Sequence, residues 1–560
     1  MRKNYLATIF FVALFTVSYA QVTYTWVGGT SGDYQSGANW SPLRTLPATT
    51  DILAFNAISA ITVNNVSNES IGAIQIASGT NAVSFATNSF ANILKLTSPV
   101  PLIYSTAGSI LSADYLAINL TNSGPFTLNT GVFGIAAGTG GKIIINSALT
   151  LNGGVLDFDE PGTGGTIITG SVTYISGIFA CVNSNAITWS GSSNYYHALS
   201  GAGVSTIPIS SWQTNSTCNI TGMNVGAIAP TGLNENNFAN FTWDCTSQFA
   251  DIELNWVTGN IGGTFSIKNT NNKSIHLSGA VGGVITAGAY AQTGGNIMLQ
   301  SSSGNISLII AGNFLHSGGI LDAVGGSSAG SATLDLKGGV TKSAIWQCSS
   351  SNAGTLVNIQ FSGTLVQPVS ITGTWTAPVA GRSNITINNS NLITGVNLTL
   401  NSVLKVFSNA SSPATLTMAG IITPADASAY VSYVGNGTLL YAGNFSQTAS
   451  AVEFPSVNGP GNLTINNSLG TKFPANFNRI LPGTLTMLNG NLAIDDFSTG
   501  NKLELTNTSL AIQLNYTNGF ITTGKLGRYF PVSGLPNSLV NGSRFPFGTG
   551  VNDRSLNIYF

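Results

Sequence analysis

Short runs in which apolar and polar residues alternate recur along most of this chain, and Gly, Asn and Ser residues separate them. Leu149–Asn152 and Asn384–Asn388 are two examples of such runs. Alternation with a period of two is typical of β-strands that bury one face, and Asn-Gly pairs turn the chain sharply. The pattern therefore predicts an all-β chain built from many short strands.

The same phrases return at distant positions, which indicates a repeat architecture. Leu149–Asp157 resembles Leu485–Ala493, and Ser383–Ser390 resembles Gly461–Ser468. The strands are short, Pro is sparse, and no unit of about 100 residues repeats, as tandem sandwiches would require. We predict an elongated parallel β-solenoid over residues 60–518, with about 20 coils of roughly 20–30 residues each. Tandem antiparallel β-sandwiches remain the alternative.

Charge is scarce in this sequence. Only 7% of the residues are Asp, Glu, Lys or Arg, with 18 basic and 19 acidic residues, whereas an ordinary domain is about 25% charged. A surface that follows nucleic-acid phosphates needs clustered Lys and Arg, and the sequence has no such cluster. The composition therefore argues against a nucleic-acid partner.

The N-terminus has the pattern of a secretory signal peptide over residues 1–20. Arg2 and Lys3 precede the apolar run Leu6–Val17, which is too short to span a bilayer, and Ser18–Ala20 supplies small residues for cleavage before Gln21. No later apolar run reaches the roughly 18 residues of a transmembrane helix. We expect a secreted or cell-surface protein without a membrane span in the mature chain.

Both ends of the mature chain differ from its repetitive body. Residues 21–59 are richer in aromatic and charged residues, and residues 519–560 are richer in Arg and Pro. The ends of a solenoid expose unpaired strand edges, so they need covering. We predict an N-terminal cap over 21–59 and a small C-terminal β module over 519–560, which stops in mid-strand and is expected to continue in a longer protein.

These two end segments carry a resemblance over less than a fifth of the chain. Thr25–Tyr34 with Ala38–Pro42 resembles the opening motif of secreted β-helical adhesin-like proteins of Gram-negative bacteria. Gly527–Pro531 with Phe545–Gly550 is similar to a module of surface proteins exported by type IX secretion. The resemblance implies a repeat-rich body displayed at the cell surface.

Catalytic motifs are weak. Gly326–Gly330 matches a nucleophile elbow around Ser328, but in that fold the catalytic His follows the Ser, and all three histidines precede it here. The motifs of solenoid polysaccharide hydrolases are also missing from the sequence. We predict no enzyme and no cofactor. Calcium is the alternative, because Asp157 and Asp159 share a strand face beside a Pro-Gly turn; a solvated turn is the simpler interpretation.

Aromatic residues and cysteines concentrate in the stretch 181–256, which we expect to form an insertion or loop region. Exposed aromatic rings pack on sugar rings, so this stretch is the candidate site for surface glycans; burial of the same rings in the core is the simpler interpretation. The predicted ligand-binding residues are Trp189, Tyr195, Tyr196, Trp212, Trp243 and Trp256.

The cysteines of the chain leave two interpretations open. They are either joined in two disulfides, as an exported chain permits, or buried as free thiols. The residues concerned are Cys181, Cys218, Cys245 and Cys348.

Taken together, these features of the sequence predict a structural or adhesin-like surface protein without catalytic activity. A carbohydrate-binding or polysaccharide-processing β-helix is the alternative.

Overall fold

The computed structural model describes most of residues 21–560. Its described residues are 21–56, 58–77, 82–89, 91–97, 102–104, 113–117, 119–135, 142–158, 165–181, 186–199, 205–326, 329–352, 354–365, 367–371, 375–376, 383–387, 392–394, 397–400, 403–407, 415–418, 421–424, 430–494, 500–530, 544–549 and 552–557. The predicted signal peptide, Asp159 and Ser328 lie outside these residues.

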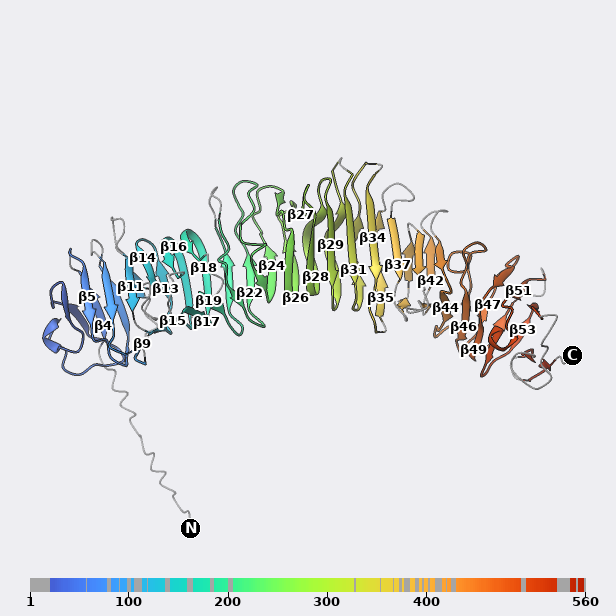
Figure 1. Cartoon of the computed structure of the whole chain (residues 1–560), viewed down its shortest axis with the longest axis horizontal. Helices are drawn as coiled ribbons and strands as arrows, with labels where there is room; N and C mark the ends of the chain where they lie inside the picture. Colours follow the sequence, from blue (N-terminus) through green and yellow to red (C-terminus); the bar gives the residue numbers. More distant parts are fainter. Residues whose placement is uncertain are drawn as a thin grey trace, which may run out of the picture. The chain divides into compact units, whose positions relative to one another are not determined.

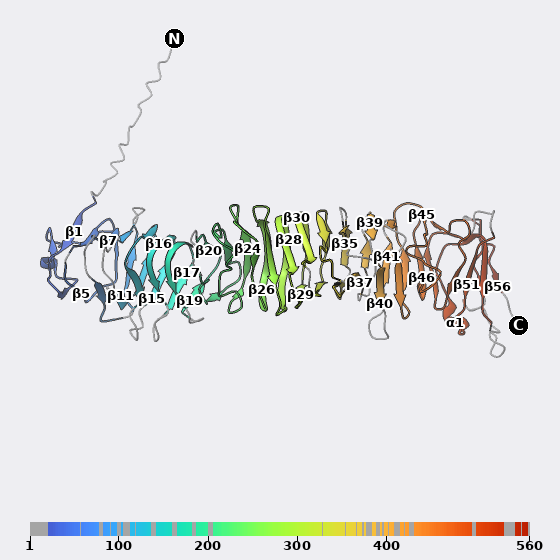
Figure 2. The ribbon, with the colours of Figure 1, turned by 90° about the horizontal axis from the view of Figure 1, so that it is seen from above.

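The structure confirms the predicted fold class. Strands make up 54% of the chain and helix 1%, and the strands form a parallel β-solenoid of about 16 turns. The chain divides into two units, residues 1–188 and 189–560. Within each unit the strands pair coil upon coil, as the successive arrows in Figures 1 and 2 show.

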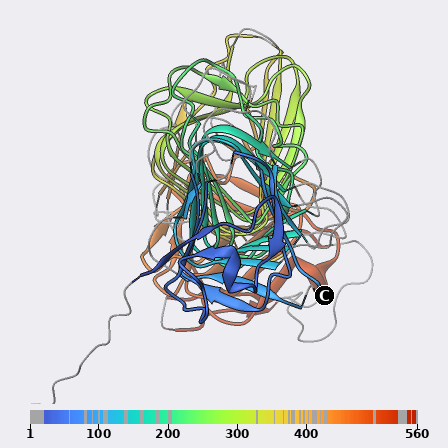
Figure 3. The same ribbon diagram turned by 90° about the vertical axis from the view of Figure 1, so that its left-hand side faces the viewer.

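Unit 1 is built from three columns of parallel strands, and Figure 3 shows its first coils (blue) from their end. The first column contains β1 (Thr23–Trp26), β4 (Ile52–Phe55), β7 (Ala73–Ile76), β10 (Leu102–Tyr104), β13 (Phe126–Leu128), β16 (Ala148–Asp157) and β18 (Ser171–Ala180). The second contains β2 (Ser31–Asp33), β5 (Ile61–Asn64), β8 (Val83–Ala86), β11 (Ala113–Ala117), β14 (Val132–Ile135) and the later parts of β16 and β18. The third contains β6 (Glu69–Ile71), β9 (Ile93–Leu96), β12 (Asn119–Asn122), β15 (Lys142–Ile145) and β17 (Gly165–Ile168).

Unit 2 continues the same construction over a longer stretch. Its first column contains β20 (Asn194–His197), β22 (Thr217–Ile220), β24 (Asn240–Asp244), β26 (Thr258–Asn269), β28 (Gly283–Gln300), β30 (Phe314–Val324), β32 (Val340–Lys342), β35 (Gln367–Ile371), β38 (Leu392–Thr394), β41 (Thr415–Met418), β44 (Thr438–Tyr441), β46 (Asn462–Asn466), β49 (Leu485–Asn489) and β52 (Leu514–Tyr516). Its second contains β23 (Asn237–Phe238), the first parts of β26 and β28, β29 (Asn305–Ile310), β31 (Ser331–Leu336), β34 (Leu356–Phe361), β37 (Ser383–Ile387), β40 (Val403–Phe407) and β43 (Val431–Val434).

A third column of unit 2 contains β25 (Ile252–Glu253), β27 (Ser274–Ser278), the last parts of β28 and β30, β33 (Ile345–Gln347) and β36 (Trp375–Thr376). Shorter parallel sets follow towards the C-terminus: β39 (Asn397–Leu400) with β42 (Ile421–Pro424), then β45 (Gln447–Thr448), β47 (Thr471–Lys472), β50 (Leu492–Ala493) and β53 (Ile521–Thr523), and β48 (Arg479–Leu481), β51 (Lys502–Leu505) and β54 (Lys525–Arg528). One helix, α1 (Leu510–Gln513), lies among the described residues of this region.

The step from a residue to its partner in the next coil varies from 19 residues, as for Ala113 and Val132, to 31 residues, as for Ser31 and Thr62. Phe126 pairs with Leu149 and Leu149 with Val172, a step of 23, while Leu315 pairs with Thr341, a step of 26. Alternate side chains along the strands are buried, as the period of two predicts. At the corner within β16, Gly154 has φ 68, and an added Cβ would lie 2.4 Å from the Gly131 carbonyl oxygen. Only glycine fits that corner.

Two sequence-based expectations are corrected here. The antiparallel sandwiches are wrong, because among the described strands only β1 with β3 (Trp40–Ser41), and β55 (Arg544–Phe545) with β56 (Leu556–Asn557), pair antiparallel. The solenoid has about 16 turns and not about 20. Parallel pairing begins at β1 with β4 and extends to β51 with β54.

Candidate functional site

The aromatic residues of the stretch 181–256 lie mostly inside the coils. Trp189, which ends β19 (Ile187–Trp189), and Tyr195, Trp243 and Trp256 are 0% exposed. The prediction that these four rings form a sugar-binding surface is wrong. Trp189, Tyr195 and Trp243 belong to the apolar faces of their strands, because they alternate with outward residues. Trp256 lies in the connection between β25 and β26.

Trp212 and Tyr196 differ from these four. Tyr196 points outward from β20 and is half-buried. Trp212, at the end of β21 (Ser211–Trp212), keeps 8% of its surface exposed. Its ring stacks on that of Trp189 with centroids 4.9 Å apart, and its indole N–H donates a hydrogen bond of 2.9 Å to Asn236 Oδ1. The Trp212 ring is therefore fixed in one orientation.

The exposed part of Trp212 forms part of a groove, named the Trp212 groove below. The groove has a volume of about 320 Å³ and lies across three successive coils, next to β22, β24 and β26 (green in Figure 1). Its lining consists of Trp212, Thr214, Asn215, Asn237, Phe238, Ala239, Asn240, Asn260, Gly262 and Gly263.

The groove arises because the connection between two consecutive strands at this corner contains fewer residues in each successive coil. Four residues separate β21 from β22, a single residue separates β23 from β24, and β26 passes the corner as one strand with an irregularity between Ile261 and Thr264. The longer connection, between β21 and β22, forms one wall of the groove, and Ala239, Gly262 and Gly263 line the hollow beside this wall.

The Asn240 side chain connects this wall to the hollow through two hydrogen bonds. Its amide Nδ2 donates to the Ser216 carbonyl oxygen at 3.1 Å, and its Oδ1 accepts from the Thr264 N–H at 2.9 Å. A Cβ on Gly263 would lie 2.4 Å from that Oδ1, so glycine is required there. Gly262 has more room, because a Cβ would meet only the Phe238 carbonyl oxygen, at 3.9 Å.

The cysteines are not joined in disulfides. All four, Cys181, Cys218, Cys245 and Cys348, are buried free thiols, which corrects the disulfide alternative. The coil register explains why: Cys218 pairs with Phe241, four positions before Cys245. The thiol of Cys245 instead contacts the Ile220 carbonyl oxygen at 3.3 Å, and that of Cys348 contacts the Val324 carbonyl oxygen at 3.2 Å.

His197 forms a buried chain of hydrogen bonds inside unit 2. Its Nδ1 lies 2.8 Å from the Tyr195 hydroxyl and its Nε2 2.7 Å from Ser205 Oγ, and the His197 side chain is fully buried. A Ser, a His and a Tyr in contact resemble catalytic machinery, but no substrate reaches groups that are buried to this degree. This cluster stabilises the core.

We predict that His197 makes the stability of unit 2 depend on pH. Burial lowers its pKa from 6.5 to about 4. As the pH falls below about 6.5, the unfolded chain takes up this proton before the folded chain does, so stability is lost between pH 6.5 and 4. His197→Gln should make this part of the unfolding-midpoint profile less steep, while His316, whose pKa burial also lowers to about 4, still contributes. A profile unchanged by the substitution would contradict the assignment.

A second cluster of polar groups lies on the outward side of the third column of unit 2. Glu253, His276, Met298, Asp322 and Gln347 occupy the same position in five successive coils. His276 Nδ1 lies 3.6 Å from Glu253 Oε2, which also accepts a hydrogen bond from Ser301.

Asp322 is the most buried carboxylate of this column, at 4% exposed. It accepts hydrogen bonds from the Gln347 amide at 2.9 Å and the Ser349 N–H at 3.0 Å. Burial raises the pKa of the Asp322 carboxyl, and the hydrogen bonds from Ser349 and Gln347 oppose this rise. The column brings an acid, an imidazole and a second acid onto one surface. The sequence analysis missed it, because only the coil length shows that these positions align.

The predicted calcium position is incompletely described. Asp157 ends β16, and Asp159 lies outside the described residues. Within the described ranges, no group of three or more His, Cys, Asp or Glu side chains is arranged to hold a metal ion. Calcium binding at Asp157 and Asp159 stays a prediction.

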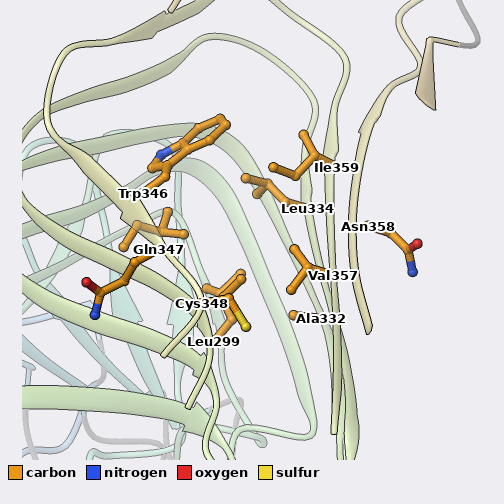
Figure 4. Close-up of a pocket in the computed structure, with 11 residues that line it drawn as sticks. Leu299, Ala332, Leu334, Trp346, Gln347, Cys348, Val357, Asn358 and Ile359 are labelled. Carbon is orange, nitrogen blue, oxygen red and sulfur yellow. The ribbon is translucent and has the colours of Figure 1, made fainter. Parts of the chain in front are cut away.

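A small cavity lies in the core beside Trp346. Figure 4 shows the Trp346 ring together with apolar side chains from neighbouring strands, including Leu334, Val357 and Ile359, while the amide of Asn358 points away from them. The cavity measures about 10 Å³, which is near the volume that a single water molecule needs. It is a packing defect and not a ligand site.

Comparisons of this chain with protein-family models, with curated proteins and with solved structures find no match. Among the described residues, no helix has the length and apolar character needed to cross a membrane.

Proposed function

We propose that this chain is an exported structural protein of the cell surface, similar to an adhesin, and that it catalyses no reaction. The observation that carries the proposal is the parallel β-solenoid, in which each unit is a stack of coils that bury their side chains against the neighbouring coils. Such repeats provide rigid and extended surfaces on which binding features are placed at the corners. The signal-like N-terminus and the resemblance of both end segments support export.

The use of ionisable groups supports the absence of catalysis. Arg44, His197 and Glu453 are all more than nine-tenths buried, and each is engaged in hydrogen bonds within the core. Groups that are held in this way serve stability. The Trp212 groove then offers a place where such a scaffold binds a partner.

Polysaccharide processing is the second candidate, because the column of Glu253, His276 and Asp322 is arranged for acid–base chemistry. Glu253 Oε1 is buried and has no hydrogen-bond partner among the described residues.

One experiment separates the two candidates. Beads coated with the purified chain should adhere to glycan-bearing surfaces more than albumin-coated beads do, and common polysaccharides incubated with the chain should release no reducing sugar. Release that disappears in Glu253→Gln and in His276→Ala would establish the enzyme instead. Adhesion no greater than that of albumin would contradict the adhesin-like function.

A further inference from the structure

We infer that the Trp212 groove binds one end of an uncharged saccharide. This inference rests on the proposed adhesin-like function and names the class of ligand and the place where it binds. It is carried by the chemistry of the groove lining, by the fixed positions of its walls, and by its volume.

The lining selects against charge. Of the described residues that line the groove, none is Asp, Glu, Lys, Arg or His. A charged ligand would lose its water there without gaining an opposite charge, which is costly. Uronic acids, sulfated sugars and phosphorylated ligands are therefore disfavoured relative to neutral hexoses and N-acetylhexosamines.

The lining also suits hydroxyl groups. Four Asn side chains lie in or beside the groove, and each amide has both donor and acceptor capacity. Asn237 is exposed, and its side-chain amide makes no hydrogen bond to another described residue, so this amide is available to a ligand. Asn260 Oδ1 accepts from Thr286 Oγ1 at 3.1 Å, which orients that amide.

An apolar surface completes the site. The exposed part of Trp212 and the neighbouring Ala239 and Gly262 offer a surface for the C–H groups of a sugar ring. Because Trp212 is already fixed by Trp189 and Asn236, little side-chain freedom is lost on binding. The volume of about 320 Å³ lies at the low end of the range for ligand pockets, about 300–1,000 Å³. A terminal sugar fits this size better than a long polymer.

Gly262 allows a test that leaves the core intact. It is exposed, and its position has space for a side chain, so Gly262→Phe should fill the groove without a clash. Thr258→Phe is the matched control, because Thr258 is exposed on the same strand and does not line the groove. Trp212→Ala is unsuitable, since Trp212 packs in the core.

The wild-type chain is first applied to an array of neutral and anionic oligosaccharides, and the strongest neutral hit is measured by titration calorimetry. We expect saturable binding that weakens by more than about tenfold in Gly262→Phe, weakens in Asn237→Ala, and is retained in Thr258→Phe. Matching thermal unfolding of the variants confirms that they fold.

Three results would overturn the inference: no neutral saccharide binds, only anionic saccharides bind, or the hit binds Gly262→Phe as tightly as the wild-type chain. The adhesion assay keeps this outcome distinct from failure of the proposed function. If beads coated with Gly262→Phe adhere as well as wild-type beads, the adhesin-like function stands and the groove is not its site.

Discussion

Replacing Trp243 with alanine is expected to lower the free energy of unfolding of unit 2 by about 3–5 kcal/mol, as is typical for removal of a buried Trp. The Trp243 side chain is 0% exposed, and its indole N–H donates to Gln248 Oε1 at 2.9 Å. The substitution leaves a cavity and also leaves that oxygen without its donor. Denaturant unfolding, with hydrogen exchange of the amides in β24, measures the change.

Two further variants provide reference values for this change in the free energy of unfolding. Trp243→Phe keeps a ring in the core and should cost less. Tyr196→Ala removes an outward, half-buried ring of the same stretch and should stay within about 0.5 kcal/mol, as is usual for surface positions. An unchanged unfolding midpoint in Trp243→Ala, with saccharide binding lost, would restore the sequence-based interpretation of an exposed binding residue.

Arg44→Ala should destabilise unit 1 by about 3–5 kcal/mol, the usual effect of breaking a buried ion pair. The guanidinium lies 3.1 Å from Asp51 Oδ2 and also pairs with Glu69. Its carbon atom Cζ lies 5.4 Å from the centre of the Tyr34 ring and 5.9 Å from that of Trp40. Without Arg44, two carboxylates stay in the core with no cation beside them.

The unfolding midpoint of unit 1, followed by hydrogen exchange in β4 and β7, measures this effect. Arg44→Lys keeps the charge but loses the planar fork that contacts both carboxylates, so it should recover only part of the stability. Lys95→Ala removes an exposed cation of unit 1 and is the control for loss of charge alone. If Arg44→Ala and Lys95→Ala unfold alike, the buried cluster does not hold unit 1 together.

Much of the fold could be predicted from alternation alone, because a period of two identifies strands and repetition identifies coils. The burial of Trp243 could also be predicted from the sequence, because Phe241 and Trp243 lie on one side of a strand and Thr242 lies on the other. Its concentration with other tryptophans suggested a binding surface, although burial of these rings in the core was the simpler interpretation. Tyr195 and Tyr196 show the same rule, because adjacent residues point to opposite faces.

The candidate sites could not be predicted in the same way, because they depend on register between coils. The groove exists because one corner is longer than the two that follow it, and the alignment of Glu253 with His276 requires the coil length at that point. Cys218 and Cys245 are separated in space for the same reason. Local sequence contains none of these distances.

Three of the irregularities in pairing fall at corners, where one strand passes from one column to the next. They occur between Asn152 and Val155 in β16, between Ile261 and Thr264 in β26, and between Thr293 and Asn296 in β28. An insertion or deletion at such a corner leaves the strands on either side in register. An insertion within a strand would instead turn every following side chain to the opposite face. Evolution can therefore reshape the outer edge of any coil while the interior stays as it is. A change that reshapes the Trp212 groove therefore need not alter the scaffold that carries it.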